Sequence, residues 1–509
     1  MITSKVKHLF PKGLLQKVLI LLTIFNLFFA SWYVLNKDIY FHTDIARDFL
    51  LLKEIKEKKV VLIGQRAGID KLYHGPAWLY INFPVYFLSN GNPIAVGWYW
   101  IMLSIIFLFA SFYIAKRLFD TEAAYFFVLL LSLYLVPQTR EFSHPHGAFL
   151  VMPLFFYTFW RYAATLKTNY LVLSVLINGL LIQFEMAIGI PIFLLSTLYI
   201  IFLQFKKKKI KHIFLLLLIF IPLSTFFIFD IRHDFIQLNG LKAYIELRSS
   251  LTINYWMLLK NRFDYFANIG APFFTGKINI IASSMFAFLL ILLIKQNTQK
   301  KLYLTFIYFY FGYFVVTLFN RGSLLIHHVM PIVPLVFLIF TSLSKTKYRQ
   351  IFLILFFLIV AVKEIESLRF IQSSNSFIGK HEDSWRFLHN LSLQVFDDAQ
   401  SNFGYFVYSP DAFAYEPKYA MFYTAGQFED KVASSFSKKH LTYVVATPPP
   451  PNEPWIKDEW WTVNKIRITK QPAKAVGFSN GYKFERYELT EEEASIPFDN
   501  TADVGINFR

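Results

Sequence analysis

The chain has 509 residues, of which 55% are hydrophobic and 19% aromatic, and its formal net charge is +17. This composition, with apolar runs near the ~20-residue length that crosses a bilayer, excludes a soluble enzyme and is typical of a polytopic helical membrane protein. The absence of Cys excludes disulfides and thiolate metal sites.

The apolar runs predict about eleven transmembrane helices. Their ranges are 15–35, 97–115, 121–137, 147–163, 170–187, 189–205, 212–229, 278–294, 302–319, 325–343 and 350–364. Short loops on one side are rich in Lys and Arg, with a run from Lys206 to Lys209, whereas the opposite loops carry isolated cations. The positive-inside rule then places the N-terminus in the cytoplasm and the C-terminus outside the cell membrane. The basic run is interpreted as a topology anchor, so we expect no nucleic-acid partner.

Three outward segments are longer than simple loops: 36–96, 230–277 and everything after about 365. The last is polar and contains alternating runs at 404–408 and 441–445 that are typical of strands. We therefore predict a membrane module over residues 1–365 and an extracytoplasmic α/β domain over residues 366–509. Its tail, after about Glu491, is predicted to be disordered.

The first outward loop opens with a charged cluster at residues 42–48, directly after the first span, where charge is costly unless it has a function. Thr43 or Asp44 is a suitable helix N-cap. Apolar residues follow at helical spacing, namely Ile45, Phe49, Leu52 and Ile55. The pattern predicts an amphipathic helix lying on the membrane surface. Two interpretations remain open: Asp44 is a helix cap beside an Arg47–Asp48 surface pair, or it is a catalytic carboxylate.

Further along the same loop, Gly75 and Pro76 interrupt the chain before a second apolar stretch. The break would expose backbone N–H groups beside Lys71 and His74, an arrangement that suits a phosphate at the membrane surface. For Lys71 the alternative is a lysine that only extends its amine to the interface.

The segments Asp44-Ile45-Ala46-Arg47 and His74-Gly75-Pro76 resemble two motifs of the GT-C superfamily, the membrane glycosyltransferases that use a polyprenyl-phosphate sugar. The resemblance is to bacterial protein mannosyltransferases and lipid A aminoarabinose transferases, a glycosyltransferase family 39-like group. Their first outer loop opens with Asp-Glu or Asp-x-x-Arg, and Lys-Pro-Pro or His-Gly-Pro follows. This chain departs from the Asp-Glu form at Ile45, which replaces its second acid. It departs from the Lys-Pro-Pro form at His74, which replaces its lysine. The resemblance covers roughly residues 15–365 and implies a GT-C-like fold.

The resemblance also implies inverting transfer of a hexose or pentose to an acceptor hydroxyl on a lipid, a glycan or a protein. Asp44 would be the general base, because a polyprenyl phosphate leaves without help from a second acid. Cations would stabilise the leaving phosphate. The outward candidates for binding the substrates are Arg47, Lys71, His74, Arg140, Arg232, His233 and His327. Glu185, at the outward end of the fifth span, is a candidate for contacting the sugar or the acceptor.

Glu141, His144 and His146 form a possible metal-binding group, but the two histidines of His-Pro-His cannot share one helical face and a fourth ligand is missing. No metal or other cofactor is therefore predicted, although a divalent ion stays an alternative. Two other functions are possible. A lipid or polysaccharide flippase would carry charges inside its spans, and a non-catalytic membrane scaffold would leave the charges of the first loop unexplained.

Overall fold

The computed structural model describes residues 13–207, 210–250, 254–270, 300–320, 322 and 324–503. Its contacts divide the chain into two compact units, each of which is described by itself. The first unit comprises Met1–Ser31, Val60–Ile81 and Trp100–Arg369. The second comprises Trp32–Lys59, Asn82–Tyr99 and Phe370–Arg509.

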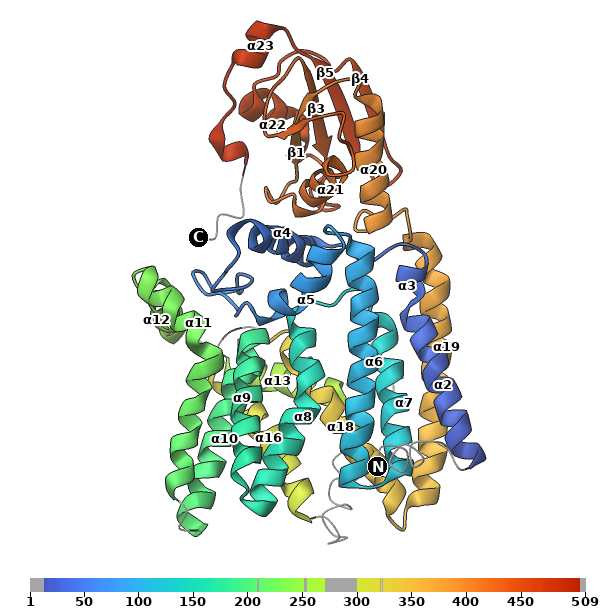
Figure 1. Ribbon diagram of the computed structural model, residues 1–509, viewed down its shortest axis with the longest axis vertical. Coiled ribbons are helices and arrows are strands. Elements are labelled where there is room, and N and C mark those ends of the chain that lie inside the picture. Colours follow the sequence, from blue (N-terminus) through green and yellow to red (C-terminus); the bar gives the residue numbers. More distant parts are fainter. Residues whose placement is uncertain are drawn as a thin grey trace. The chain divides into compact units, whose positions relative to one another are not determined.

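The first unit is a bundle of long helices that run side by side (Figure 1). Its elements are α2 (Leu14–Ala30), α7 (Thr121–Gln138), α8 (His144–Thr165), α9 (Thr168–Phe184), α10 (Met186–Lys207), η1 (Ile210–Ile219), α11 (Phe220–Arg232), α12 (Ile236–Ser250), α13 (Tyr255–Gly270), α16 (Lys300–Phe319), α17 (Ile326–Val329), η2 (Met330–Ile332), α18 (Val333–Thr341) and η3 (Ser342–Lys345), with the start of α5 (Ala77–Leu88) and most of α6 (Pro93–Leu118) and α19 (Arg349–Phe377).

Six helical segments of the described chain are long and apolar enough to cross a membrane. They are Pro93–Leu118, Thr121–Gln138, Met186–Lys207, Ile210–Arg232, Lys300–Phe319 and Ile326–Lys345. Three shorter apolar helices accompany them: Leu14–Ala30, Ala77–Leu88 and Thr168–Phe184. The predicted class, a polytopic helical membrane protein, is confirmed. The number of eleven spans stays a prediction, and its eighth span, 278–294, lies outside the described residues.

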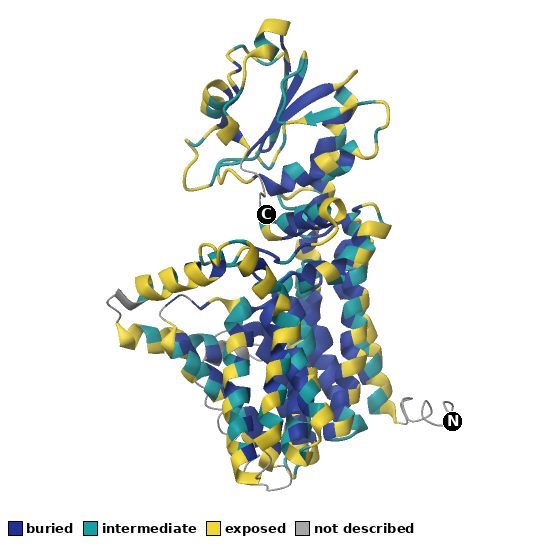
Figure 2. Ribbon diagram, turned by 60° about the vertical axis from the view of Figure 1, so that its left-hand side comes forward, coloured by how far each residue is buried: buried dark blue, intermediate teal, exposed yellow. Residues whose placement is uncertain are grey.

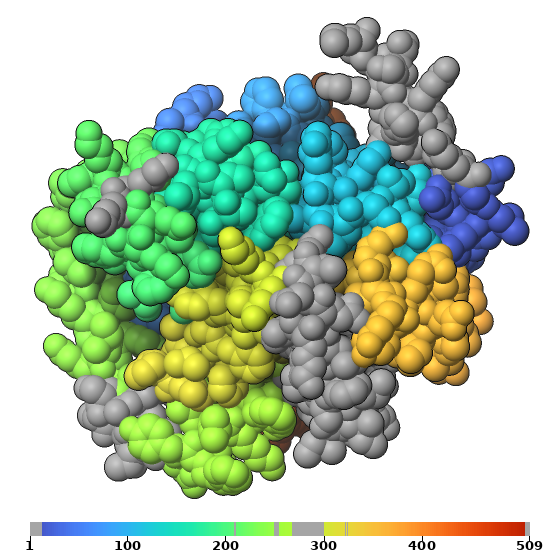
Figure 3. All heavy atoms as spheres, turned by 90° about the horizontal axis from the view of Figure 1, so that it is seen from below, coloured from blue at the N-terminus to red at the C-terminus, as the bar shows by residue number. Residues whose placement is uncertain are grey.

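Packing within the bundle is sequential, with α8 against α9, α9 against α10, α10 against α16, and α2 against α7. Figure 3 shows the end of the bundle, where α2, α6 and α7, the green helices α8 to α10, and α16 lie beside one another. Buried residues occupy the interior and exposed residues the outside (Figure 2). Large apolar side chains are among the exposed ones, including Phe109, Phe202 and Phe214. An apolar exterior is what a bilayer requires, because lipid tails solvate such side chains.

Charged loops lie at one end of the bundle. Lys345 pairs with Asp120, and Arg349 lies 2.6 Å from Glu122, so the start of α7 and the start of α19 meet there. α7 runs away from this end toward Gln138, whose Oε1 lies 3.1 Å from Nε2 of His146 near the start of α8. The start of α8 therefore lies at the opposite end of the bundle from the basic loops.

The second unit is built around a five-stranded mixed sheet of order β2-β1-β3-β5-β4. Its strands are β1 (Phe403–Tyr408), β2 (Ala433–Ser435), β3 (Leu441–Ala446), β4 (Lys474–Gly477) and β5 (Lys483–Glu488). Its helices are α3 (Trp32–Leu35), α4 (Thr43–Lys58), α20 (Trp385–Asp398), α21 (Tyr415–Ala425), α22 (Asp458–Trp461), η4 (Thr462–Ile466), α23 (Glu491–Ser495) and η5 (Asn500–Ala502).

The two predicted strands form β1 and β3, which pair in parallel with Tyr405 opposite Tyr443. Every residue of β1 is buried, which explains its nearly continuous apolar sequence. The segment after Glu491, predicted to be disordered, is folded as far as residue 503. Phe498 packs on the hydrophobic core that includes Phe406, and Asp499 pairs with Lys465 at 2.6 Å.

This second unit also contains segments 32–59 and 82–99, which the sequence analysis assigned to the membrane module. The buried carboxylate of Asp38 shows why 32–59 belongs here. Its Oδ2 accepts hydrogen bonds from Gly379 N at 3.0 Å and Ser384 Oγ at 2.5 Å, and its Oδ1 accepts from Arg386 N at 3.0 Å. Burial raises the pKa of Asp38 to about 6, although these hydrogen bonds favour its ionised form.

Candidate functional site

Asp44 lies in the first turn of α4, with its side chain 57% exposed. Arg47, which is mostly buried, lies 2.8 Å from Asp44 and 3.3 Å from the buried Asp48, so one guanidinium holds both carboxylates. The predicted pairing of Arg47 with Asp48 is present. The predicted N-cap is wrong, because the cap is His42, whose Nδ1 accepts from Asp44 N. Asp44 is thus not used as a cap, and its carboxylate stays accessible.

Thr43, the other predicted cap, has a different partner. Its hydroxyl donates to Oε1 of Glu416, at the start of α21, at 2.5 Å. Burial raises the pKa of Glu416 to about 7, and the hydrogen bond from Thr43 partly opposes this effect. This contact fixes the first turn of α4, and therefore the position of Asp44.

The apolar face of α4 is buried against protein within the second unit, which differs from the predicted location on a membrane surface. Ile45, Phe49 and Ile55 are at most 1% exposed. The ring of Phe49 lies 5.1 Å from that of Tyr419 in α21. The periodicity was interpreted correctly, but α21, rather than lipid, covers this face.

A second group of polar side chains gathers within the first unit. We call it the His–Glu cluster and define it as His74, His144, Glu185, His327 and His328. One ligand atom from each of His74, His144 and Glu185 lies within 4.8 Å of the others, and the same holds for Glu185, His327 and His328. The rings of His74 and His144 are 4.1 Å apart, and those of His327 and His328 are 4.5 Å apart. Glu185 is the residue common to both triplets.

The backbone directs Glu185 into this cluster. α9 ends at Phe184 and α10 starts at Met186, and between them Glu185 is extended, with φ −148° and ψ 99°. Its Oε1 accepts from Ala187 N at 3.1 Å, while Oε2 lies 3.8 Å from Nδ1 of His144. The helix break therefore turns a residue that would otherwise follow the helix surface toward the histidines.

His74 is fixed by backbone contacts on both sides. Its N–H donates to Gln65 O and its carbonyl accepts from Gly64 N, both at 2.8 Å. The next residue, Gly75, donates to Gln183 O at 3.0 Å. A Cβ at Gly75 would lie 3.0 Å from Gln183 Cα and overlap the side-chain amide of that residue. The glycine of the His-Gly-Pro motif is therefore required by close approach to the end of α9.

Helix ends supply the remaining members. His144 is the first residue of α8, and its Nδ1 lies 2.7 Å from Phe184 O. His328 lies in α17, and its Nδ1 accepts from Leu325 N at 3.2 Å. The buried Tyr313 hydroxyl is 3.0 Å from His328 O and 3.3 Å from Ala187 O, which connects the starts of α17 and α10.

The other predicted substrate-binding residues are not among the members of this cluster. Arg140 pairs with Glu141 at 3.5 Å. Lys71 is exposed in a turn beside Gly240, and Arg232 is exposed at the end of α11. His233 stacks on Phe229, with its Nδ1 2.8 Å from Phe229 O. Glu141, His144 and His146, which the sequence offered as an alternative metal group, are not among the convergent groups of the described residues, and His146 stacks on Phe142 and contacts Gln138.

Sequence reasoning missed residues that hold the site in place. Arg262 is buried and donates to the carbonyls of Asn320 and Gly322, close after the end of α16. Arg262, Tyr313 and Glu416 are separated from their partners in sequence, and no local motif marks them. An arginine within a largely apolar stretch is the signal that could have marked Arg262 as functionally or structurally important.

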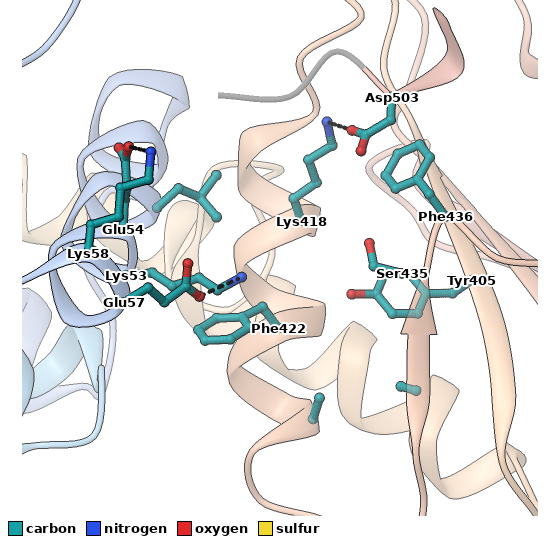
Figure 4. A pocket seen from close by; sticks show the side chains of 13 residues that line it. Lys53, Glu54, Glu57, Lys58, Tyr405, Lys418, Phe422, Ser435, Phe436 and Asp503 are labelled. Atoms are coloured by element: carbon teal, nitrogen blue, oxygen red, sulfur yellow. Dashed lines mark hydrogen bonds and ion pairs between the residues drawn. The ribbon is translucent and has the colours of Figure 1, made fainter. Parts of the chain in front are cut away.

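A cleft of about 690 Å³ lies within the second unit, between α4 and the elements α21, β1 and β2 (Figure 4). Its cations are paired: Lys58 with Glu54 at 2.9 Å, and Lys418 with Asp503 at 3.1 Å. Lys53 lies 4.2 Å above the ring of Phe422. Because its charges neutralise one another, this cleft is a weaker candidate for an anionic ligand than the His–Glu cluster.

The apolar helices and the separate five-stranded sheet define a polytopic helical membrane protein with a small α/β domain. No protein-family model and no curated protein matches the sequence. In its fold, the chain is similar to ArnT from Cupriavidus metallidurans. For ArnT bound to undecaprenyl phosphate the TM-score is 0.62 at 12% identity, over 93% of this chain and 98% of ArnT. For ArnT in the apo state the TM-score is 0.60 at 10% identity, again over 93% of this chain and 98% of ArnT. The GT-C-like fold implied by the sequence is confirmed.

Proposed function

We propose that this chain is an inverting membrane glycosyltransferase that moves a monosaccharide from a polyprenyl-phosphate donor to an acceptor hydroxyl. The observation that carries the proposal is the similarity of fold, over nearly the whole of both chains, to ArnT bound to undecaprenyl phosphate. The Asp-x-x-Arg and His-Gly-Pro motifs support it independently of the fold.

Asp44 is the proposed general base. Its exposed carboxylate takes the proton of the acceptor hydroxyl as the oxygen attacks the anomeric carbon. The bond from that carbon to the phosphate oxygen breaks, the configuration inverts, and the polyprenyl phosphate leaves with the bonding electrons. Arg47 acts as a positioning residue, because it bridges Asp44 to the buried Asp48.

Cationic groups stabilise the negative charge that grows on the leaving phosphate. The proposed groups are Lys71, His74 and Arg232. His74 has the strongest structural support, because its backbone is fixed by its neighbours and its side chain belongs to a buried polar cluster. Lys71 and Arg232 are exposed.

The proposed orientation has the N-terminus in the cytoplasm and the His–Glu cluster at the extracytoplasmic end of the bundle. The charged loops with Lys345 and Arg349 lie at the end of the bundle opposite the start of α8, which supports this orientation by the positive-inside rule. The chain has no Cys, so single cysteines report sidedness directly. A membrane-impermeant maleimide should label Asp70→Cys in intact cells, but Lys167→Cys only after permeabilisation. The reverse labelling pattern would refute the orientation.

The function is tested with full-length protein in nanodiscs and a panel of radiolabelled polyprenyl-phosphate hexoses and pentoses. We expect release of polyprenyl phosphate and transfer of label to an acceptor from the source membranes. Asp44→Asn should lower turnover by about 10²- to 10⁴-fold, the usual contribution of a general base. Glu57→Gln is a matched control on the same helix, since Glu57 is also exposed.

Two results would contradict this proposal. Near-normal turnover of Asp44→Asn would refute the base assignment. Movement of an intact lipid-linked sugar across the bilayer, without release of polyprenyl phosphate, would show a flippase instead.

A further inference from the structure

We propose that the cleft in the second unit binds an uncharged carbohydrate. Its lining comes from α4, α21, β1, β2 and two neighbouring residues, all of which belong to the second unit, so the site is complete within one compact part of the chain. Its volume of about 690 Å³ lies in the range of ~300–1,000 Å³ that is usual for small-molecule sites. The cleft is therefore large enough for a saccharide unit with part of its neighbours.

The two walls of the cleft differ in chemistry. Figure 4 shows the charged side chains of α4 on one wall, and Tyr405, Ser435 and Phe436 on the opposite wall. Phe422 of α21 lies between them, and the small side chain of Ala433 leaves room beside it. A ligand in the cleft would thus meet charged groups on one side and aromatic rings and hydroxyls on the other.

The charges of the cleft favour a neutral ligand. Its lining contains three lysines and three acids. Each lysine has an acidic partner: at 3.6 Å for Lys53, at 2.9 Å for Lys58 and at 3.1 Å for Lys418. Because the sum of these charges is zero, the cleft offers no net attraction to a phosphate, a carboxylate or a cation.

Paired charges suit the hydroxyl groups of a sugar. A carboxylate can only accept hydrogen bonds and an ammonium can only donate them, whereas a hydroxyl does both. Two neighbouring hydroxyls can therefore bind one lysine–acid pair, the first by donating to the carboxylate and the second by accepting from the ammonium. Two such pairs border the cleft, Glu54 with Lys58 and Asp503 with Lys418. The exposed Ser435 adds a hydroxyl of its own.

The aromatic rings suit the rest of a sugar. Phe422 is 36% exposed, and Nζ of Lys53 lies 4.2 Å from the centre of its ring. Nζ of Lys418 lies 5.1 Å from the centre of the Phe436 ring. A sugar ring carries apolar C–H groups on its faces and hydroxyls at its edge. An aromatic ring with an ammonium beside it offers apolar surface to the first and a hydrogen-bond donor to the second.

The geometry of the sheet favours a carbohydrate over a peptide. Ala433 and Ser435 both line the cleft, and residues two positions apart in a strand point to the same face of the sheet. The cleft therefore lies over the face of β2. An extended peptide that joins a sheet pairs with the edge of a strand instead.

The consequence for transfer rests on the proposed function. Asp44 and Lys53 lie on the same helix, α4, and are about 14 Å apart along its axis at 1.5 Å per residue. A glycan of several units is long enough to cover this distance. The cleft would then hold a remote unit of a glycan acceptor, so that the proposed acceptor class is a neutral oligosaccharide or polysaccharide.

The test uses full-length protein in nanodiscs and four uncharged trisaccharides: maltotriose, cellotriose, mannotriose and chitotriose. Saturation-transfer NMR measures their binding to the wild-type protein without a donor, so the result needs neither turnover nor a variant. We expect at least one to bind with a Kd between about 0.1 and 10 mM, at the weak end of the affinity scale. A trisaccharide of galacturonic acid should bind at least about tenfold more weakly, because the cleft has no net positive charge.

Substitutions then locate the site. Ser435→Trp should fill the cleft and weaken binding at least about tenfold, and an exposed strand position accepts tryptophan. Val432→Trp is its matched control, because Val432 is 59% exposed just before the same strand and outside the lining. Lys53→Gln should weaken binding about tenfold, the usual effect of one hydrogen bond to a charged group. Lys56→Gln, at an exposed position of α4 outside the lining, should leave binding unchanged.

Three results would overturn the proposal. They are the absence of binding by all four trisaccharides at about 10 mM, wild-type binding by Ser435→Trp, and tighter binding of a neutral hexapeptide of serine and alanine than of any trisaccharide. The proposed function can fail separately. Sugar transfer without trisaccharide binding would refute the cleft alone, whereas trisaccharide binding without release of polyprenyl phosphate would refute the transferase alone.

Discussion

The burial of Glu416 predicts how the stability of the second unit depends on pH. Glu416 is buried, and burial raises its pKa from the ordinary 4.5 to about 7. Between these two values the folded state binds more protons than the unfolded state, so stability falls as the pH rises from about 4.5. Above pH 7 the carboxylate is ionised in both states and the loss is complete.

The size of the effect follows from the shift. The pKa rises by about 2.5, and each pKa unit corresponds to about 1.4 kcal/mol, so ionisation of Glu416 costs about 3 kcal/mol at pH 8. Glu416→Gln removes this cost and keeps an oxygen that accepts from Thr43. We expect it to stabilise the protein by about 3 kcal/mol at pH 8 and by roughly 1 kcal/mol at pH 5.

Tryptophan fluorescence during heating measures the effect, because Trp385 is buried in the same unit and its ring lies 5.3 Å from that of Tyr423 in α21. The midpoint of Glu416→Gln should exceed that of the wild type by several degrees at pH 8 and by much less at pH 5. Glu429 is exposed in the same domain, so Glu429→Gln should leave the unfolding midpoint unchanged at both pH values. An equal shift of Glu416→Gln at both pH values would refute the reasoning.

Three further substitutions test separate parts of the structure. Gly75→Ala should destabilise the protein by about 1–3 kcal/mol, because its Cβ overlaps Gln183; an unchanged melting temperature would contradict this. Arg47→Lys should lower kcat by roughly 10- to 100-fold with normal melting, because lysine cannot hold two carboxylates in one planar fork; a wild-type kcat would remove its positioning role. Arg349→Ala should cost less than about 1 kcal/mol, since its pair with Glu122 is half-exposed, and a larger fall in thermal stability would show that the bundle end depends on it.

Much of the fold could be predicted from local pattern. The span predicted at 121–137 is α7, Thr121–Gln138, because the length of an apolar run limits the length of the helix directly. The strand predicted at 441–445 is β3, Leu441–Ala446. The apolar spacing of α4 likewise identified residues that are buried, such as Phe49. These features depend on neighbours within a few positions in the chain.

The candidate site was less predictable. His74, Glu185 and His327 were each marked by residue type and by their place at the outward ends of apolar runs. Their convergence with His144 could not be derived, because it depends on the extended conformation at Glu185 and on the close approach of Gly75 to Gln183. Such contacts join residues far apart in sequence, and no periodicity encodes them.

The sequence by itself determined the class of protein, the positions of its apolar helices and the motifs that carry the resemblance, since hydrophobic length and spacing act locally. Only the tertiary structure decided what covers α4, why Asp38 is buried, and which histidines meet Glu185. Each of these depends on how helix ends and loops pack. The free energy of a buried carboxylate is set by the groups that surround it in space rather than by its neighbours in the chain.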